Sequence, residues 1–126
     1  MNQTVNKKEI IKSLKLKEIV LNDIIFKKLI DSDLTEVDYI YLSSNENLTK
    51  KQIKYLFTLK IDNVNINLLR NSNCPSTKID KFIDLKDKIY NIAIAHNINI
   101  TKDQIDKLVD INDDDVNLSL KFMNLI

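Results

Sequence analysis

The chain of 126 residues contains no glycine and no tryptophan, and it has one proline, one cysteine and one histidine. Tight turns between β-strands usually need glycine, so its absence argues against a β-sandwich or a β-barrel. A single cysteine cannot form an intramolecular disulfide, which fits a reducing compartment. No apolar run approaches the roughly 18 residues of a membrane span and no signal peptide opens the chain, so the sequence predicts a cytoplasmic protein without a membrane segment.

The few side chains that could support catalysis are scattered and form no set of convergent groups. His96 is expected to end a helix, where a cation is favourable, and Cys74 is expected to be a small turn residue. The acidic run DINDDD at 110–115 lacks the glycine and the closing glutamate of an EF-hand loop, so helix capping by Asp113 or Asp114 explains it better. The sequence therefore predicts a protein that is not an enzyme and that holds no cofactor and no metal.

The sequence does contain an internal repeat with a period of 26 residues. Its first halves align without a gap and read SNENLTKKQIKYL (44–56), RNSNCPSTKIDKF (70–82) and HNINITKDQIDKL (96–108). Its second halves read VNINLLRN (64–71), YNIAIAHN (90–97) and VNLSLKFM (116–123). A period between about 20 and 50 residues indicates a solenoid, in which each unit buries its apolar side only against its neighbours.

The repeat organises the chain as a single repeat domain. Residues 45–70, 71–96 and 97–126 are the clear units, and residues 22–44 are a degenerate unit. Residues 1–21 carry apolar side chains at helical spacing, so we expect them to form an N-terminal helical cap.

The first half of each unit is predicted to be an α-helix. Apolar residues recur at the i, i+3, i+6 spacing of one helix face, as in IKYLFTL (53–59). TKKQ (49–52) and TKDQ (101–104) have the spacing of a capping box, in which a threonine and a glutamine satisfy free backbone donors at the helix start. In the middle unit, Pro75 is expected in the first helical turn, where its missing N–H costs nothing.

The second halves allow two interpretations, because VNINL at 64–68 alternates like a β-strand and also fits one face of a helix. As strands, the second halves resemble the L-x-L-x-x-N pattern of a leucine-rich repeat horseshoe. As helices, the units resemble the variant leucine-rich repeat, a family of bacterial α-solenoids akin to HEAT repeats. The unit of that family runs Asn-Pro-Asn-Thr-Pro, an apolar helix, an Asp-rich turn and then Val-Arg-x-Ala-Val-Ala-x-Asn.

The resemblance to the variant leucine-rich repeat covers residues 22–124. It is carried by NSNCP (71–75), by the helix through Ile79 and Phe82, by YNIAIAHN (90–97) and by INDDDV (111–116). The chain departs from the family pattern with Asn65, Asn91 and Asn117 in place of the arginine, and with Asn67 in place of a small residue. The resemblance implies an all-α fold, a short right-handed α-solenoid of 26-residue helix pairs with an N-terminal helical cap. The alternative is an α/β leucine-rich repeat.

We therefore expect the function to depend on the surface of the repeats. On the helical interpretation the second helix is apolar on two sides, and solenoids line their concave face with this element. We expect a protein–protein interaction module of bacterial or mobile-element origin, which binds and modulates or scaffolds a partner protein. The candidate binding residues are Asn65, Ile66, Arg70, Asn91, Ile92, His96, Asn117 and Leu118. Two other roles stay open, because the isoleucines could simply pack between units and the asparagines could form a ladder of hydrogen bonds.

Charge is uneven along the chain: residues 1–30 hold seven lysines against three acidic residues, and residues 101–126 hold three lysines against six aspartates. A basic N-terminal face on a HEAT-like solenoid could bind nucleic acid, DNA in particular. Its possible phosphate contacts are Lys7, Lys8, Lys12, Lys15 and Lys17. The apolar C-terminal end at 122–126 could in turn be the contact of a homodimer.

Overall fold

A computed structural model describes residues 21–126 of the chain. The predicted N-terminal cap, except for Leu21, lies outside the described residues. The predicted phosphate contacts lie outside them too; these are Lys7, Lys8, Lys12, Lys15 and Lys17.

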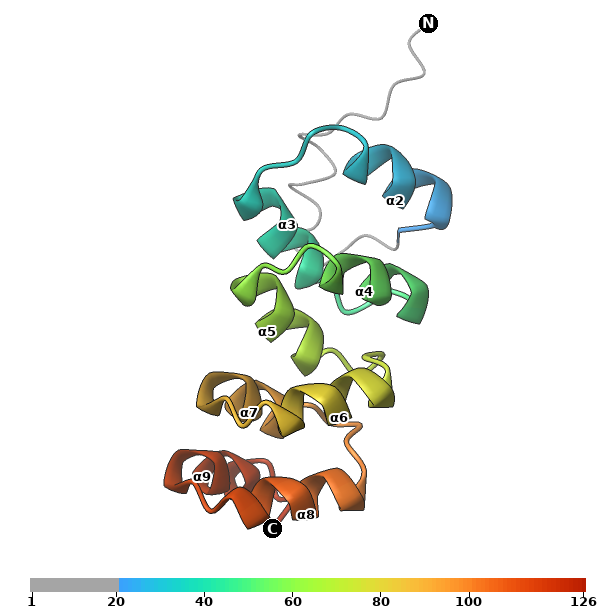
Figure 1. The fold of residues 1–126 in the computed structure, drawn as a ribbon. Coiled ribbons are helices and arrows are strands. Elements are labelled where there is room, and N and C mark those ends of the chain that lie inside the picture. The colour runs from blue at the N-terminus through green and yellow to red at the C-terminus, as the bar shows by residue number, and fades with distance from the viewer. Residues whose placement is uncertain (1–20) are drawn as a thin grey trace, which may run out of the picture.

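The described residues form eight α-helices and no β-strand. The helices are α2 (Asp23–Ile30), α3 (Glu36–Ser43), α4 (Lys50–Phe57), α5 (Asp62–Arg70), α6 (Ser76–Asp84), α7 (Lys88–Ala95), α8 (Lys102–Ile111) and α9 (Asp114–Phe122). In sequence order they form four successive pairs; the two helices of each of the last three pairs pack against each other, and Figure 1 shows the pairs following one another along the molecule. The prediction of an all-α fold built from helix pairs is confirmed, and the right-handed winding stays a prediction.

The second halves of the repeats are the helices α5, α7 and α9, so the alternative of an α/β leucine-rich repeat is wrong. Val64 and Leu68, four residues apart, are both fully buried, as one face of a helix requires. Asn67, which makes the segment alternate like a strand, donates its side-chain amide to Ile40 O (3.1 Å) and to Ser43 Oγ (3.0 Å) in the preceding pair. This polar residue therefore joins two units instead of facing solvent from a strand.

The predicted helix starts are present, with one correction. Both predicted capping boxes, at 49–52 and 101–104, are confirmed: the threonine hydroxyl accepts from the glutamine N–H, and the glutamine side chain accepts from the threonine N–H. A third capping box, between Thr35 and Asp38, was not predicted. Pro75 is the N-cap of α6 and does not lie in its first turn, because its backbone is still extended with ψ at 134°.

Each clear unit opens with two asparagines separated by one residue, and in the units that start at residues 71 and 97 these asparagines bind the backbone of earlier units. The side-chain carbonyls of Asn71 and Asn97 accept the N–H two residues ahead, both at 2.8 Å. The Asn71 amide donates to Asn45 O at 3.0 Å. The Asn97 amide donates to Asn71 O at 2.9 Å and to Leu69 O at 2.8 Å. Because all of these amides are buried, they satisfy carbonyl groups that water does not reach.

The second asparagine of the pair adds a further bond between units. Asn73 donates to Leu48 O at 2.9 Å, and Asn99 donates to Ser72 O at 3.0 Å. We refer to Asn45, Asn71, Asn73, Asn97 and Asn99 together as the asparagine ladder.

Capping glutamines connect the first helices in the same way. The Gln104 amide donates to Ser76 Oγ at 2.9 Å and to Asp80 Oδ1 at 3.1 Å, both on α6. The Gln52 amide donates to Asp23 Oδ1 on α2 at 3.3 Å and to Leu21 O just before α2 at 2.9 Å. A single glutamine thus caps its own helix and binds the preceding unit.

The apolar core repeats with the same period as the ladder. One fully buried column has a member in each helix pair, at the 26-residue spacing; it consists of Leu42, Leu68, Ile94 and Leu120. Since every unit buries the same position, the second helices repeat in a constant orientation, and their remaining faces point the same way.

The ladder gives a first testable prediction. Asn97→Ala removes two donated hydrogen bonds and one accepted bond at a buried site and leaves two carbonyls without that donor, so it should lower the free energy of unfolding by about 3 kcal/mol. Urea unfolding followed by circular dichroism measures this loss. Asn63→Ala, at an exposed position of α5, is the matched control and should change little. Equal losses for both variants would contradict the ladder.

Candidate protein-binding face

The second helices of the four pairs, α3, α5, α7 and α9, form a continuous row. Each contacts the next one along the row, and Figure 1 shows them following one another on the same side of the molecule. Because every unit runs in the same direction, the N-terminal ends of these helices lie along one edge of the row. Their C-terminal ends lie along the other edge.

An apolar stripe runs along this row: Ile40, Ile66, Ile92 and Leu118 lie along its middle, Val37 and Ile89 lie near the helix starts, and Phe122 lies at the last residue of α9. Its exposed members are Val37, Ile89, Leu118 and Phe122, with exposed fractions of 57%, 62%, 66% and 77%. Its partly buried members pack against the core and are Ile40, Ile66 and Ile92. Within one helix they lie three residues apart on α3 and α7 and four apart on α9, which is the spacing of one helix face, and α5 contributes Ile66 alone. We call these seven residues the apolar stripe.

The edge of the row formed by the helix N-terminal ends is mainly acidic. The first residues of α3, α5 and α9 are Glu36, Asp62 and Asp114. The first residue of α7 is Lys88, whose ammonium lies 2.7 Å from Asp115 Oδ2 and 3.6 Å from Asp113 Oδ2. The hydrogen bond to Asp115 raises the pKa of Lys88, so this lysine stays charged and its charge is matched within the protein. Carboxylates at these positions also suit the positive end of each helix dipole.

The predicted capping role of Asp113 is confirmed. Its side chain accepts from the N–H groups of Val116 at 3.1 Å and Asp115 at 2.9 Å, at the start of α9. The bond from the Val116 N–H is the main cause that lowers the pKa of Asp113. The acidic run before α9 is therefore explained by capping.

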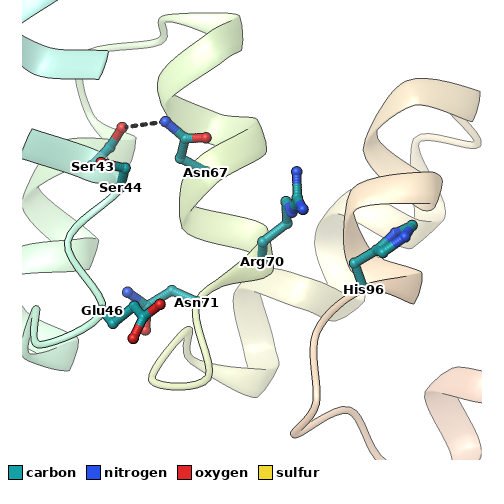
Figure 2. A pocket seen from close by; sticks show the side chains of 7 residues that line it. All are labelled: Ser43, Ser44, Glu46, Asn67, Arg70, Asn71 and His96. Carbon is teal, nitrogen blue, oxygen red and sulfur yellow. Dashed lines mark hydrogen bonds between the residues drawn. The ribbon is translucent and has the colours of Figure 1, made fainter. Parts of the chain in front are cut away.

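At the opposite edge lies a polar pocket of about 310 Å³. Its lining comes from the ends of α3, α5 and α7 and from the turns after α3 and α5; the residues are Ser43, Ser44, Glu46, Asn67, Arg70, Asn71 and His96 (Figure 2). The His96 Nδ1 lies 2.9 Å from Ile92 O. A carbonyl oxygen can only accept, so Nδ1 carries the proton and Nε2 is left for another partner.

Arg70 is the cation of this pocket. Among residues 21–126, no hydrogen bond or ion pair engages its guanidinium group, which offers five donors. Figure 2 shows the Arg70 side chain pointing away from Glu46, which lies on the other side of the pocket. The nearby helix-end carbonyls are already used, since Leu69 O accepts from Asn97 and Ile92 O binds His96. Arg70 is therefore available to an external acceptor.

The predicted binding residues divide into two groups. Ile66, Arg70, Ile92, His96 and Leu118 lie on the row, in the stripe or beside the pocket. In contrast, Asn65 and Asn91 are buried, with exposed fractions of 8% and 1%, and Asn117 is partly buried. The surface available to a partner is therefore narrower than predicted.

The position of this asparagine column has a geometric cause. Asn65, Asn91 and Asn117 each precede a stripe residue by one position, which turns their side chains about 100° away from the stripe. Asn65 and Asn91 make no strong hydrogen bonds: Asn65 only approaches Tyr90 of the next unit, with Nδ2 and Oη 3.5 Å apart. Within the described part of the chain, neither polar atom of the Asn91 side chain has a hydrogen-bond partner. The column is therefore not the predicted ladder; that role belongs to the asparagines at the unit starts.

Two exposed members of the stripe, Val37 and Ile89, were missed by the sequence prediction. They lie three residues before Ile40 and Ile92, one helical turn away. The i, i+3 spacing was the signal that could have identified them.

The described residues provide few groups for chemistry. Between residues 21 and 126 no three His, Cys, Asp or Glu side chains come together in a way that could hold a metal ion. Cys74 is buried, and desolvation raises the pKa of its thiol to about 12 against a smaller opposing effect of Lys78. Across the same residues, each helix is too short or too polar to span a bilayer.

Comparison with known proteins found no family model, no curated protein and no solved structure that matches this chain.

The unpaired asparagine gives a second prediction. Asn91→Leu replaces a buried amide by an apolar side chain of similar size, so it should raise the free energy of unfolding by about 1–2 kcal/mol. The same change at a paired position, Asn97→Leu, should instead destabilise the protein. Urea unfolding of both variants makes the comparison, and a stability loss in Asn91→Leu would show that Asn91 has a partner.

Cys74 gives a third prediction. With a pKa of about 12, the thiol holds almost no thiolate near neutral pH, so a disulfide reagent should modify it slowly in the native protein. At pH 8 the rate should rise steeply with urea, as unfolding exposes the thiol. Rapid modification without urea, with an apparent pKa near the ordinary value of about 8.5, would contradict this burial.

Proposed function

We propose that the chain is a non-enzymatic protein-interaction module, which binds and modulates or scaffolds a partner protein through the row of second helices. The observation that carries this proposal is the apolar stripe, a run of large apolar side chains across the whole row with four of them exposed. Contiguous apolar patches of this kind are typical of interaction surfaces.

The energetics favour a protein partner on this face. Each Val, Leu, Ile or Phe side chain gains about 1.5–3 kcal/mol on full burial, and Val37, Ile89, Leu118 and Phe122 are the side chains of the row with most to gain. The flanking charged edge and polar pocket would form the rim of such an interface, as in other protein complexes.

The alternative is DNA binding by a basic N-terminal face, which depends on lysines between residues 7 and 17. Within residues 21–126, fourteen basic side chains stand against sixteen acidic ones, and one edge of the row is acidic. Phosphate binding needs an excess of positive charge, so these residues support a protein partner better than a nucleic acid.

The C-terminal end supports a second contact, with another copy of the chain. Phe122 and Ile126 are exposed there, while Leu125 packs against the core. The homodimer remains a prediction, and light scattering of the purified protein over a range of concentrations tests it.

The partner proposal gives a fourth prediction. Ile89→Glu places a charge on the stripe at a position 62% exposed, so it should abolish partner capture while the fold is retained. Ile24→Glu on α2 is the matched control, because Ile24 is 70% exposed and lies outside the row. The measurement is affinity capture from lysate of the source cells, with and without nuclease. Circular dichroism of both variants checks the fold.

The proposal expects one protein to be captured by the native chain and by Ile24→Glu, to be absent with Ile89→Glu, and to survive nuclease. Loss on nuclease treatment would replace it with the nucleic-acid alternative. A partner retained by Ile89→Glu would show that the stripe is not the binding face.

A further inference from the structure

We infer that the segment bound by this row is an amphipathic α-helix, which lies along the row across α3, α5, α7 and α9, with apolar residues at heptad spacing and carboxylates toward Arg70. This inference rests on the proposed function and names the chemistry of the partner.

The spacing of the stripe favours a helix. Helices in direct contact lie about 8–10 Å apart, so equivalent stripe residues such as Ile66 and Ile92 recur along the row at about that interval. Seven residues of an α-helix rise about 10.5 Å and return to nearly the same side after two turns. A heptad pattern therefore presents one apolar group to each second helix in succession.

An extended segment fits the same interval poorly. Residues on one side of a β-strand are two apart, at about 6.6 Å, or four apart, at about 13 Å. The first distance falls at least about 1.4 Å short of a period of about 8–10 Å and the second exceeds it by about 3 Å or more, whereas a heptad of helix exceeds it by only about 0.5 Å at the upper end. An extended ligand would therefore fall out of step with the stripe sooner than a helix.

The width of the row also suits a helix. From the first residue of α5, Asp62, to Arg70 is eight residues, or about 12 Å along the helix axis. A helix with its side chains is about 10–12 Å in diameter. One helix laid along the stripe would therefore have the acidic edge on one side and the polar pocket on the other.

The pocket defines the charge on one side of the bound helix. Arg70 has a guanidinium group without a partner in residues 21–126, whereas the neighbouring His96 directs its Nδ1 proton to Ile92 O, so its Nε2 is an acceptor and offers no donor. A carboxylate is the acceptor that a guanidinium binds best, in a bidentate geometry. Carboxylates on the side of the bound helix that faces the pocket would therefore pair with Arg70.

The acidic edge of the row defines the charge on the other side of the bound helix. Glu36, Asp62 and Asp114 start three of the four second helices, and the lysine that starts the fourth is paired with Asp113 and Asp115. Lysine or arginine side chains complement this edge. The expected ligand therefore has three tracks: basic, apolar and acidic. The bound helix is expected to lie in the direction that places its acidic side over Arg70.

Three synthetic helical peptides of about 25 residues test the inference by fluorescence anisotropy with the full chain. The first carries leucine at heptad spacing, glutamate on one flank and lysine on the other. The second has the same composition with the leucines spread around the helix, and the third has heptad leucines with lysine on both flanks. The first should bind at least tenfold more tightly than the second.

Arg70→Ala then separates the charge contact from the apolar one. This substitution should weaken binding of the first peptide about tenfold and leave binding of the third peptide unchanged, because only the first peptide places carboxylates at the pocket. Lys54→Ala, an exposed lysine of α4 outside the row, is the control. Equal binding of the first two peptides, no binding of any peptide, or an equal effect of Arg70→Ala on the first and third would each overturn the inference. The proposed function fails separately, when Ile89→Glu still captures the native partner.

Discussion

The hydrogen bonds from one unit's asparagines to the backbone of the unit before are the constraint on which the rest of the structure depends. Asparagine can carry out this task because its side chain is both acceptor and donor. The carbonyl of Asn97 closes its own turn on the Asn99 N–H, while its amide reaches Leu69 O and Asn71 O. A chain without glycine thus obtains a tight turn and a joint between units from the same residue. The bonds are buried, so their geometry is specific and a slipped alignment would leave several polar groups unpaired.

The fixed alignment between units explains the binding face. When every unit starts at the same place relative to its neighbour, position 66 of one second helix lies beside position 92 of the next. The isoleucines then form a stripe, the helix starts form an acidic edge, and Arg70 and His96 come together at the other edge. None of these features exists in a single unit. The ladder therefore links a local turn motif to a surface that spans the molecule.

The first half of each unit could be predicted almost completely, because its signals are local. Capping boxes, helix spacing and the repeat period all lie within a few residues of one another. The second half could not be decided, since VNINL fits both a strand and a helix, and the deciding contacts of Asn67 reach Ile40 and Ser43 in another unit. For the same reason Asn65 and Asn91 were placed on the surface: a single residue of helix changes the direction of a side chain by about 100°. The asparagine ladder could not be predicted, because its hydrogen bonds depend on the distance between units, which the sequence does not give.

Side-chain amide hydrogen exchange, measured by NMR, tests most directly whether the ladder holds the units together. If the account is right, the amide groups of Asn71 and Asn97 exchange as slowly as the backbone amides of α5 and α7, because both are released only when the units separate. The exposed Asn63 provides the reference rate for a free side chain. Exchange of Asn71 and Asn97 at the rate of Asn63 would contradict the account, since the units would then be held in alignment by the apolar core alone.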